Sequence, residues 1–174
     1  LTTTQVQALS TSQVKAMEVG DLAAMSTAQI AALTTTQVGA LSAAQVTSLT
    51  TGQVAALTTA QVNVLSSAQV QALSTDQVAA LTTGQVAALT TGSISALSEA
   101  DVRALSTGQI NAISTAGVAV MSTAQVAVLS TDQVAAFSTS QVAALTTTEA
   151  ATLSAAQAKA LTTAQVQQLT TDNV

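Results

Sequence analysis

The 174-residue sequence contains no cysteine, proline, histidine, tryptophan or tyrosine, and only one phenylalanine. Without cysteine the chain has no disulfides and no thiolate metal sites, and without histidine it lacks the commonest side-chain base and metal ligand. Lysine and arginine number three in total, too few for the basic surface that nucleic-acid binding requires. We therefore expect no enzyme, no catalytic residue, no cofactor, no metal site and no nucleic-acid partner.

Long apolar runs and bulky apolar side chains are scarce as well. No run approaches the roughly 20 residues that a membrane-spanning helix needs, so we expect no membrane span. Hydrophobic residues make up 48% of the chain, and most of them are alanine, valine and leucine, which favours a thin core over a thick globular one. The sequence shows neither an initiator methionine nor a signal peptide, and we expect a mature or internal piece of a protein.

An eight-residue unit recurs throughout the chain. LSTDQVAA occupies residues 73–80 and returns at 129–136, and LTTGQVAA occupies residues 49–56 and 81–88. Cut from Leu1, the chain divides into twenty-one octads and a six-residue remnant, with the consensus L-[ST]-T-x-Q-V-x-A and no insertion or deletion. This unbroken phase predicts one continuous array over residues 1–174, as part of a longer array or of an end-to-end stack.

Neither one long helix nor a strand suits this period. An octad overshoots two helical turns by about 80°, so the leucine stripe would circle a long helix and no partner would cover it. In a strand, position 1 of the octad would face away from positions 6 and 8. Each octad is therefore predicted to form its own helix of about five or six residues.

Two helix-start signals coincide in almost every octad. Position 2 is serine or threonine except at Glu18, and position 5 is glutamine in sixteen octads. A hydroxyl N-cap followed three residues later by glutamine forms a capping box, and the apolar residues at positions 1 and 6 form a hydrophobic staple. We predict such caps at Ser74 with Gln77 and at Ser130 with Gln133. Acids fall only at positions 2–5 and bases only at position 7, as the helix dipole favours.

Helices this short are not stable alone, so the octads must bury their apolar side chains against one another, as the repeats of a solenoid do. The sequence predicts an all-α solenoid of very short helices, one per octad, and leaves two or three octads per superhelical turn as alternatives. Positions 1 and 6 are predicted to form the core, for example Leu1, Leu33, Leu49, Leu81, Val54, Val86 and Val134.

Position 3 of the octads is expected to face solvent as a row of threonines, which begins with Thr3, Thr11, Thr27, Thr35 and Thr51. A regular hydroxyl row suggests an alternative function, a binding module for ice or glycan. The two close acid pairs, Glu18 with Asp21 and Glu99 with Asp101, lie on predicted first helical turns. Acids stabilise a helix there without any metal or catalytic role.

The octads LTTGQVAA and LSTDQVAA resemble L-[ST]-x-x-Q-[VI]-x-A tracts of long secreted and surface proteins of bacteria, of adhesin type. The resemblance spans the whole chain and carries over no functional residue. It implies an extracellular or cell-surface location in bacteria and a role as a spacer, rod or filament subunit. We therefore expect a non-enzymatic structural repeat whose partner is itself, through end-to-end stacking, with a cell surface or glycan as a further partner.

Overall fold

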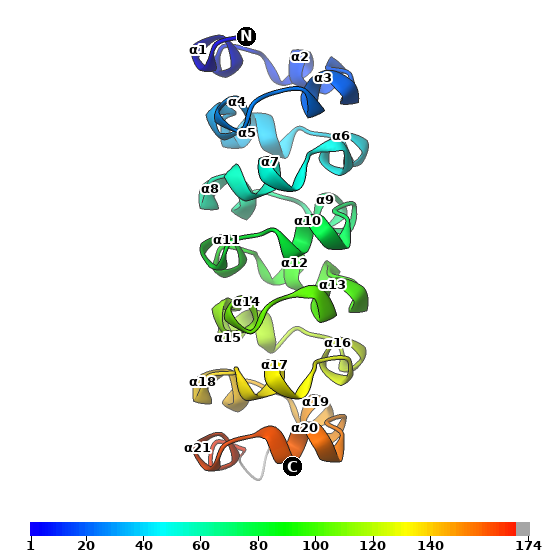
Figure 1. Ribbon diagram of the computed structural model, residues 1–174, viewed down its shortest axis with the longest axis vertical. Helices are drawn as coiled ribbons and strands as arrows, with labels where there is room; N and C mark the ends of the chain where they lie inside the picture. Colours follow the sequence, from blue (N-terminus) through cyan, green and yellow to red (C-terminus); the bar gives the residue numbers. More distant parts are fainter. Residues whose placement is uncertain (170–174) are drawn as a thin grey trace. The chain divides into compact units, whose positions relative to one another are not determined.

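The computed structural model describes residues 1–169, which form twenty-one short helices and no strand (Figure 1). This confirms the predicted all-α fold with one helix per octad. The helices have five or six residues, except α15 and α21 with four. Their bounds are α1 Thr3–Gln7, α2 Thr11–Ala16, α3 Val19–Ala23, α4 Thr27–Ala32, α5 Thr35–Gly39, α6 Ala43–Ser48, α7 Thr51–Ala56, α8 Thr59–Asn63, α9 Ser67–Gln71, α10 Thr75–Ala79, α11 Thr83–Ala87, α12 Thr91–Ala96, α13 Glu99–Ala104, α14 Thr107–Ala112, α15 Thr115–Val118, α16 Thr123–Ala127, α17 Thr131–Ala135, α18 Thr139–Ala143, α19 Thr147–Ala151, α20 Ala155–Ala160 and α21 Thr163–Val166.

Every helix begins at position 3 of its octad, directly after the capping residue. In α1 the Gln5 backbone N–H donates to Thr2 Oγ1 (3.2 Å), and the Thr2 N–H donates to Gln5 Oε1 (2.8 Å). Among the described helices only α3, α12 and α15 lack this reciprocal box. In α3 the N-cap is Glu18, and in α12 and α15 the third helical residue is Ser93 or Gly117. The octad therefore defines its own helix start.

The chain enters each helix through extended backbone at position 2, and where position 1 is the C-cap of the preceding helix it is extended as well. Leu33 has φ −57° and ψ 139°, and Thr34 has φ −71° and ψ 158°. Two such residues in succession end one helix and redirect the chain into the next, and we call this two-residue connection a corner. No described residue has a positive φ, so these corners do not use the left-handed glycine that ends many helices.

Within each part of the chain, a helix packs against the helix three places further on. Thus α1 contacts α4, α4 contacts α7, and α2 contacts α5 (Figure 1). Three octads therefore make one superhelical turn. Of the two alternatives that the sequence left open, the structure has three octads per turn, because each corner turns the chain by a third of a circle.

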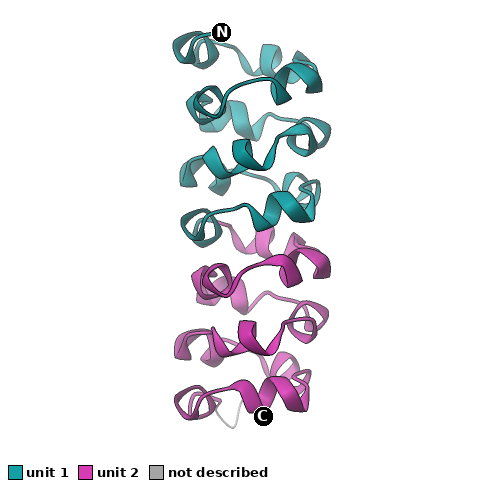
Figure 2. Ribbon diagram, in the orientation of Figure 1, with its two compact units in different colours: residues 1–88 teal, residues 89–174 magenta. Residues whose placement is uncertain are grey.

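The chain divides into two compact units, Leu1–Ala88 and Leu89–Val174 (Figure 2). The first contains α1–α11 and the second contains α12–α21. The boundary falls between two octads, and the eight-residue phase continues through it. The expectation of one continuous array over residues 1–174 stays a prediction.

Positions 1 and 6 line the interior of each unit. The expected core residues that are buried, with 0–5% of their surface exposed, are Leu33, Leu49, Val54, Leu81, Val86 and Val134. The expectation fails at Leu1, which is 67% exposed. No turn of the given sequence precedes Leu1, so no earlier turn covers its side chain, whereas the leucines of this column from Leu33 onward have an earlier turn beside them.

Candidate functional site

The side chain of Gln37 links two turns of the first unit. Its Oε1 accepts from the Thr34 N–H (2.7 Å), which completes the capping box of α5. Its Nε2 donates to the carbonyl oxygens of Val6 (2.9 Å) and Leu9 (2.7 Å). Those carbonyls lie at the end of α1 and in the corner after it. The Val6 carbonyl also accepts from the Leu9 N–H (3.2 Å), whereas the Leu9 carbonyl lies beyond the helix, where no helical N–H follows to pair with it. One buried amide thus caps the start of its own helix and the end of a helix in the preceding turn.

Further position-5 glutamines repeat this arrangement, and we call the set the glutamine ladder. Each donates through Nε2 to the carbonyls 31 and 28 residues earlier, which belong to position 6 of one octad and position 1 of the next. The members are Gln37, Gln45, Gln53, Gln61, Gln69, Gln77 and Gln85 in the first unit, and Gln125, Gln133, Gln141 and Gln157 in the second. Gln29 and Gln165 also donate to the carbonyl 28 residues earlier.

The predicted caps lie within this ladder. The Ser74 N–H donates to Gln77 Oε1 (2.7 Å), and the Ser130 N–H donates to Gln133 Oε1 (2.8 Å). Gln77 and Gln133 are only 3% and 4% exposed. A buried amide is costly unless its donors and acceptor are all paired. The ladder pairs them, so these glutamines add burial without an unsatisfied polar group.

The sequence analysis found the caps but missed the second role of the same glutamines. A carboxylate completes a capping box as well as an amide does, yet it has no N–H to donate. The sixteen glutamines at position 5 contrast with one glutamate, Glu149. This preference for glutamine over glutamate at position 5 was the sequence signal that the side-chain N–H groups have a role as donors.

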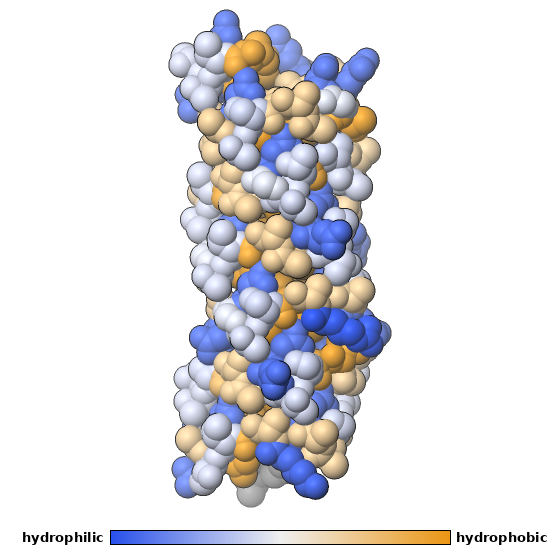
Figure 3. Space-filling view, in the orientation of Figure 1, coloured by the Kyte–Doolittle hydropathy of each residue, from blue (hydrophilic) through white to orange (hydrophobic). Residues whose placement is uncertain are grey.

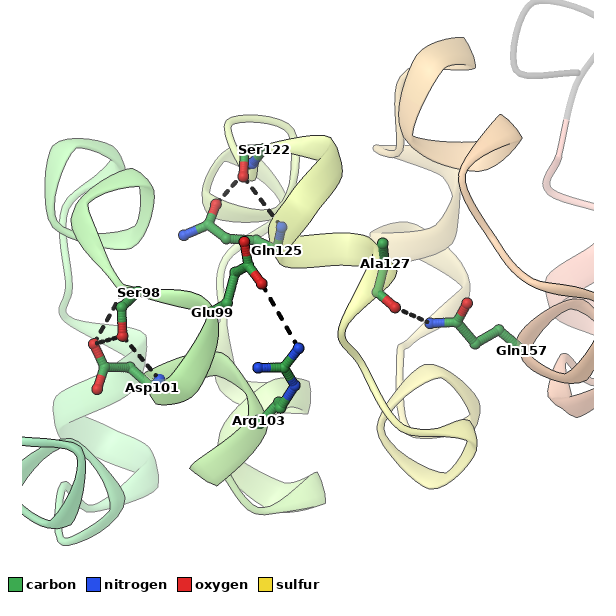
Figure 4. Close-up of polar contacts among 8 residues, drawn as sticks. All are labelled: Ser98, Glu99, Asp101, Arg103, Ser122, Gln125, Ala127 and Gln157. Carbon is green, nitrogen blue, oxygen red and sulfur yellow. Dashed lines mark hydrogen bonds and ion pairs between the residues drawn. The ribbon is translucent and has the colours of Figure 1, made fainter.

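Figure 4 shows amide and carboxylate versions side by side in the second unit. Asp101 Oδ2 accepts from the Ser98 N–H (2.9 Å) and hydroxyl (2.7 Å), as a cap requires. Gln157 instead extends its Nε2 to the backbone carbonyl of Ala127 (3.4 Å) in the previous turn. Both residue types can thus start a helix, and only the amide also donates to the turn before.

A second set of links runs forward along the chain from position 7. The donors Thr47, Asn63 and Asn111 each reach the carbonyl oxygen of the residue 25 positions later, at 2.8–2.9 Å. The sequence analysis treated position 7 as freely variable and did not identify these contacts. Short polar side chains at this position join successive turns from the outside of the solenoid.

The threonines expected to form one exposed row lie in two separate columns. Thr3, Thr27 and Thr51 begin α1, α4 and α7, which pack on one another, while Thr11 and Thr35 begin α2 and α5. All are exposed except the half-buried Thr11. The single row is therefore a wrong expectation: with three octads per turn, neighbouring octads face in different directions.

The remaining surface is weakly polar. On the face shown in Figure 3, residues of intermediate hydropathy in pale colours predominate, and strongly hydrophilic residues in blue are scattered. Glu99 and Arg103 form an exposed ion pair at 3.6 Å, an arrangement that adds only a few tenths of a kcal/mol. Residues 1–169 show no pocket, no cluster of three or more metal-ligating side chains, and no helix long and apolar enough to cross a membrane.

Stacked short helices joined by backbone-directed glutamines define a helical repeat protein. The model of the ALTTAQ repeat family matches residues 14–51, 54–91, 94–131 and 118–147. These matches cover most of the sequence, and the chain belongs to the ALTTAQ repeat family. The motif ALTTAQ itself stands at residues 56–61 and 160–165, where it joins one octad to the next. No curated protein and no solved structure matches the chain.

Proposed function

We propose that the chain is a non-enzymatic structural element of a bacterial extracellular or cell-surface filament, and that it self-associates. The observation that carries this proposal is the glutamine ladder. Its acceptors are backbone carbonyls, such as those of Val6 and Leu9 for Gln37, and every octad has them whatever its side chains. Each superhelical turn therefore presents the same backbone carbonyl acceptors to the glutamines of the next turn. Further turns can be added without an octad of a different sequence.

The distribution of sequence variation supports a structural role. Positions 1, 5 and 6 are buried in most octads, while the variable positions 4 and 7 are exposed in most. The residues that recur are those that build the solenoid, and they account for its bonding and packing. A structural repeat needs no more than this from its sequence.

Electron microscopy and light scattering of the purified 174-residue chain test the proposal together. We expect linear assemblies of uniform width, and a weight-average mass that rises with protein concentration. A chain that stays monomeric over the accessible concentration range would contradict the filament role. The location is tested separately with an antibody against the repeat: intact cells of the source organism should be labelled without permeabilisation.

A binding role for the threonine columns is the second candidate. In the first unit Thr11, Thr35, Thr59 and Thr83 begin α2, α5, α8 and α11, whose successive members pack on one another. A Cβ added at Gly84 in the next turn would lie 3.7 Å from a methyl carbon of Thr59, so these two positions are neighbours on successive turns. Thermal hysteresis tests ice binding, and a glycan array tests carbohydrate binding. Values equal to those of Thr35→Ala/Thr59→Ala would contradict this candidate.

A further inference from the structure

Glu149 stands at position 5 of its octad, where most octads have a glutamine. It lies inside the second unit, with complete octads before and after it in the sequence, and it is 3% exposed. Its Oε2 accepts from the Thr146 N–H (2.6 Å), as the Oε1 of a ladder glutamine does. Within residues 1–169 this N–H is the one hydrogen-bond donor to the carboxyl group. A buried carboxylate with a single donor is costly.

The carbonyl group that a ladder glutamine would bond from this position lacks a donor. The ladder intervals of 31 and 28 residues lead from position 149 to Val118 and Met121. The Val118 carbonyl accepts from the Met121 N–H (3.0 Å). The Met121 carbonyl receives no hydrogen bond from the part of the chain that the structure describes, and Met121 is only 4% exposed. In the preceding turn, by contrast, the Leu97 carbonyl is bonded by Gln125 (2.8 Å).

The surroundings of Glu149 offer no positive charge to balance a carboxylate. The helix α19 packs on α16, which has no titratable side chain. Of the helices next to α19 in sequence, α18 has no titratable side chain either, and α20 has only Lys159, which is exposed at position 7. Among residues 1–169, Glu149 forms no ion pair. The carboxyl group therefore lies buried between a backbone N–H and the backbone of the preceding turn.

We propose that Glu149 is a pH-dependent member of the ladder, and that its protonated side chain donates its O–H to the Met121 carbonyl. A neutral carboxylic acid, formed by uptake of a proton from solvent, has one O–H donor and can still accept through its other oxygen. It therefore reproduces both kinds of bond that a ladder glutamine makes. The carboxylate makes only the bond to the Thr146 N–H, so the additional bond between α16 and α19 forms in acid and is lost as the pH rises.

The methionines of the sequence, three in number, allow this bond to be observed directly. Methionine labelled with ¹³C at the carbonyl carbon gives one signal each for Met17, Met25 and Met121, and the variant Met121→Leu assigns the third. The Met17 carbonyl accepts from Gln45 (2.9 Å) and the Met25 carbonyl accepts from Gln53 (2.7 Å). These two signals are therefore internal references for a carbonyl that a ladder glutamine bonds at every pH.

We expect the Met121 signal to move downfield, as a newly bonded carbonyl does, when the pH is lowered from about 7 to about 3, through the range in which glutamate ordinarily titrates. The Met17 and Met25 signals should stay in place. In the variant Glu149→Gln the Met121 signal should already lie at its bonded position and should not change with pH. This variant is expected to fold, because sixteen octads have glutamine at position 5.

Thermal unfolding measures the same bond through the difference between Glu149→Gln and the original chain. At about pH 7 the variant should unfold about 4–8 °C higher, and at about pH 3 the difference should fall below about 2 °C, because the protonated glutamate then donates as well. Asp132→Asn is the matched control, since Asp132 is an exposed acid in the first turn of α17. It should stay within about 2 °C of the original chain at both pH values.

The two measurements can each overturn the inference. A Met121 signal that stays in place while the Glu149 carboxyl carbon titrates would show that no bond forms, and the same movement in Glu149→Gln would assign it to another group. A stability difference that is as large in acid as at neutral pH would show that protonation does not complete the ladder. Circular dichroism at both pH values establishes that the folded chain is being compared.

Discussion

The Nε2 of Gln37 lies 2.9 Å from the carbonyl oxygen of Val6, thirty-one residues earlier in the chain. Through this contact the residue that helps to start one helix also closes the end of a helix in the turn before. The same side chain therefore specifies local structure and holds the superhelix together. Replacing a ladder glutamine by alanine therefore removes both effects together.

We expect Gln77→Ala to destabilise the first unit by about 2–4 kcal/mol. The substitution removes the bond to the Ser74 N–H and those to the Val46 and Leu49 carbonyls. The buried Leu49 carbonyl then loses its partner, while the Val46 carbonyl keeps the Leu49 N–H (3.2 Å). Urea unfolding followed by circular dichroism measures the change. Amide hydrogen exchange should show the loss near α10 and the turn before it, because repeat arrays can open locally.

Gln71→Ala is the control for this substitution, since Gln71 is exposed at position 7. Its unfolding free energy should stay within about 0.5 kcal/mol of that of the original chain. Equal effects at positions 71 and 77 would show that the ladder contributes nothing beyond the loss of a helical side chain.

The caps themselves predict a smaller effect. Ser130→Ala removes the hydroxyl that accepts from the Gln133 N–H (3.1 Å), and we expect a loss of about 1 kcal/mol. Thr131→Ala, at the next position, removes an exposed hydroxyl outside the capping box and should be nearly neutral. Thermal unfolding of the two variants compares them directly, and a larger loss for Thr131→Ala would contradict the assigned phase.

The sequence predicts what happens inside an octad and leaves open what happens between octads. The hydroxyl at position 2 and the glutamine at position 5 act on each other over a short stretch of chain, so the pattern shows the helix start at Ser74 or Ser130 directly. The corner angle depends on backbone torsions such as those of Leu33 and Thr34, which most residues can adopt. Two octads per turn, the first alternative, and three were therefore both compatible with the pattern.

Errors about the candidate site have the same origin. Whether Thr3 and Thr11 lie in one row depends on the number of octads per superhelical turn. The acceptors of Gln37 depend on the same number, because they lie in the preceding superhelical turn. Leu1 was expected in the core because its octad looks ordinary, but its burial depends on a neighbouring turn. Interactions between octads were thus the part that the repeat pattern alone did not fix.

Glu149→Gln should stabilise the second unit by about 1 kcal/mol. Glu149 completes its capping box through the Thr146 N–H (2.6 Å), but a carboxylate has no donor for the turn before. The ladder intervals of 31 and 28 residues point a glutamine here at the carbonyls of Val118 and Met121. Thermal unfolding of Glu149→Gln should show a higher unfolding temperature than that of the original chain. Asp132→Asn removes one charge at an exposed first-turn position of the same unit, so a similar rise there would attribute the effect to charge alone.

Gly117→Ala should destabilise the second unit by about 1–3 kcal/mol. An added Cβ would lie 2.9 Å from Cγ2 of Ile113 and 3.3 Å from Cγ1 of Ile94, too close without rearrangement of the core. Branched isoleucines thus fill the space that a ladder glutamine would otherwise take. Gly52→Ala is the control, because its nearest contact would be at 3.9 Å and alanine favours helix. Calorimetry should show opposite shifts, and equal shifts would contradict this packing.

Deleting one complete octad should leave the first unit folded. Without residues 49–56, the three-octad spacing would bring Gln61 onto the carbonyls of Leu22 and Met25, the acceptors that Gln53 uses in the intact chain. Those acceptors are backbone atoms, and the core positions of neighbouring octads are nearly identical, so the unfolding temperature should fall by less than about 5 °C. Deleting only residues 53–56 removes fewer residues but leaves a corner without its helix. It should lower the unfolding temperature by more than about 10 °C, and a smaller effect than that of the octad deletion would contradict an architecture based on the eight-residue period.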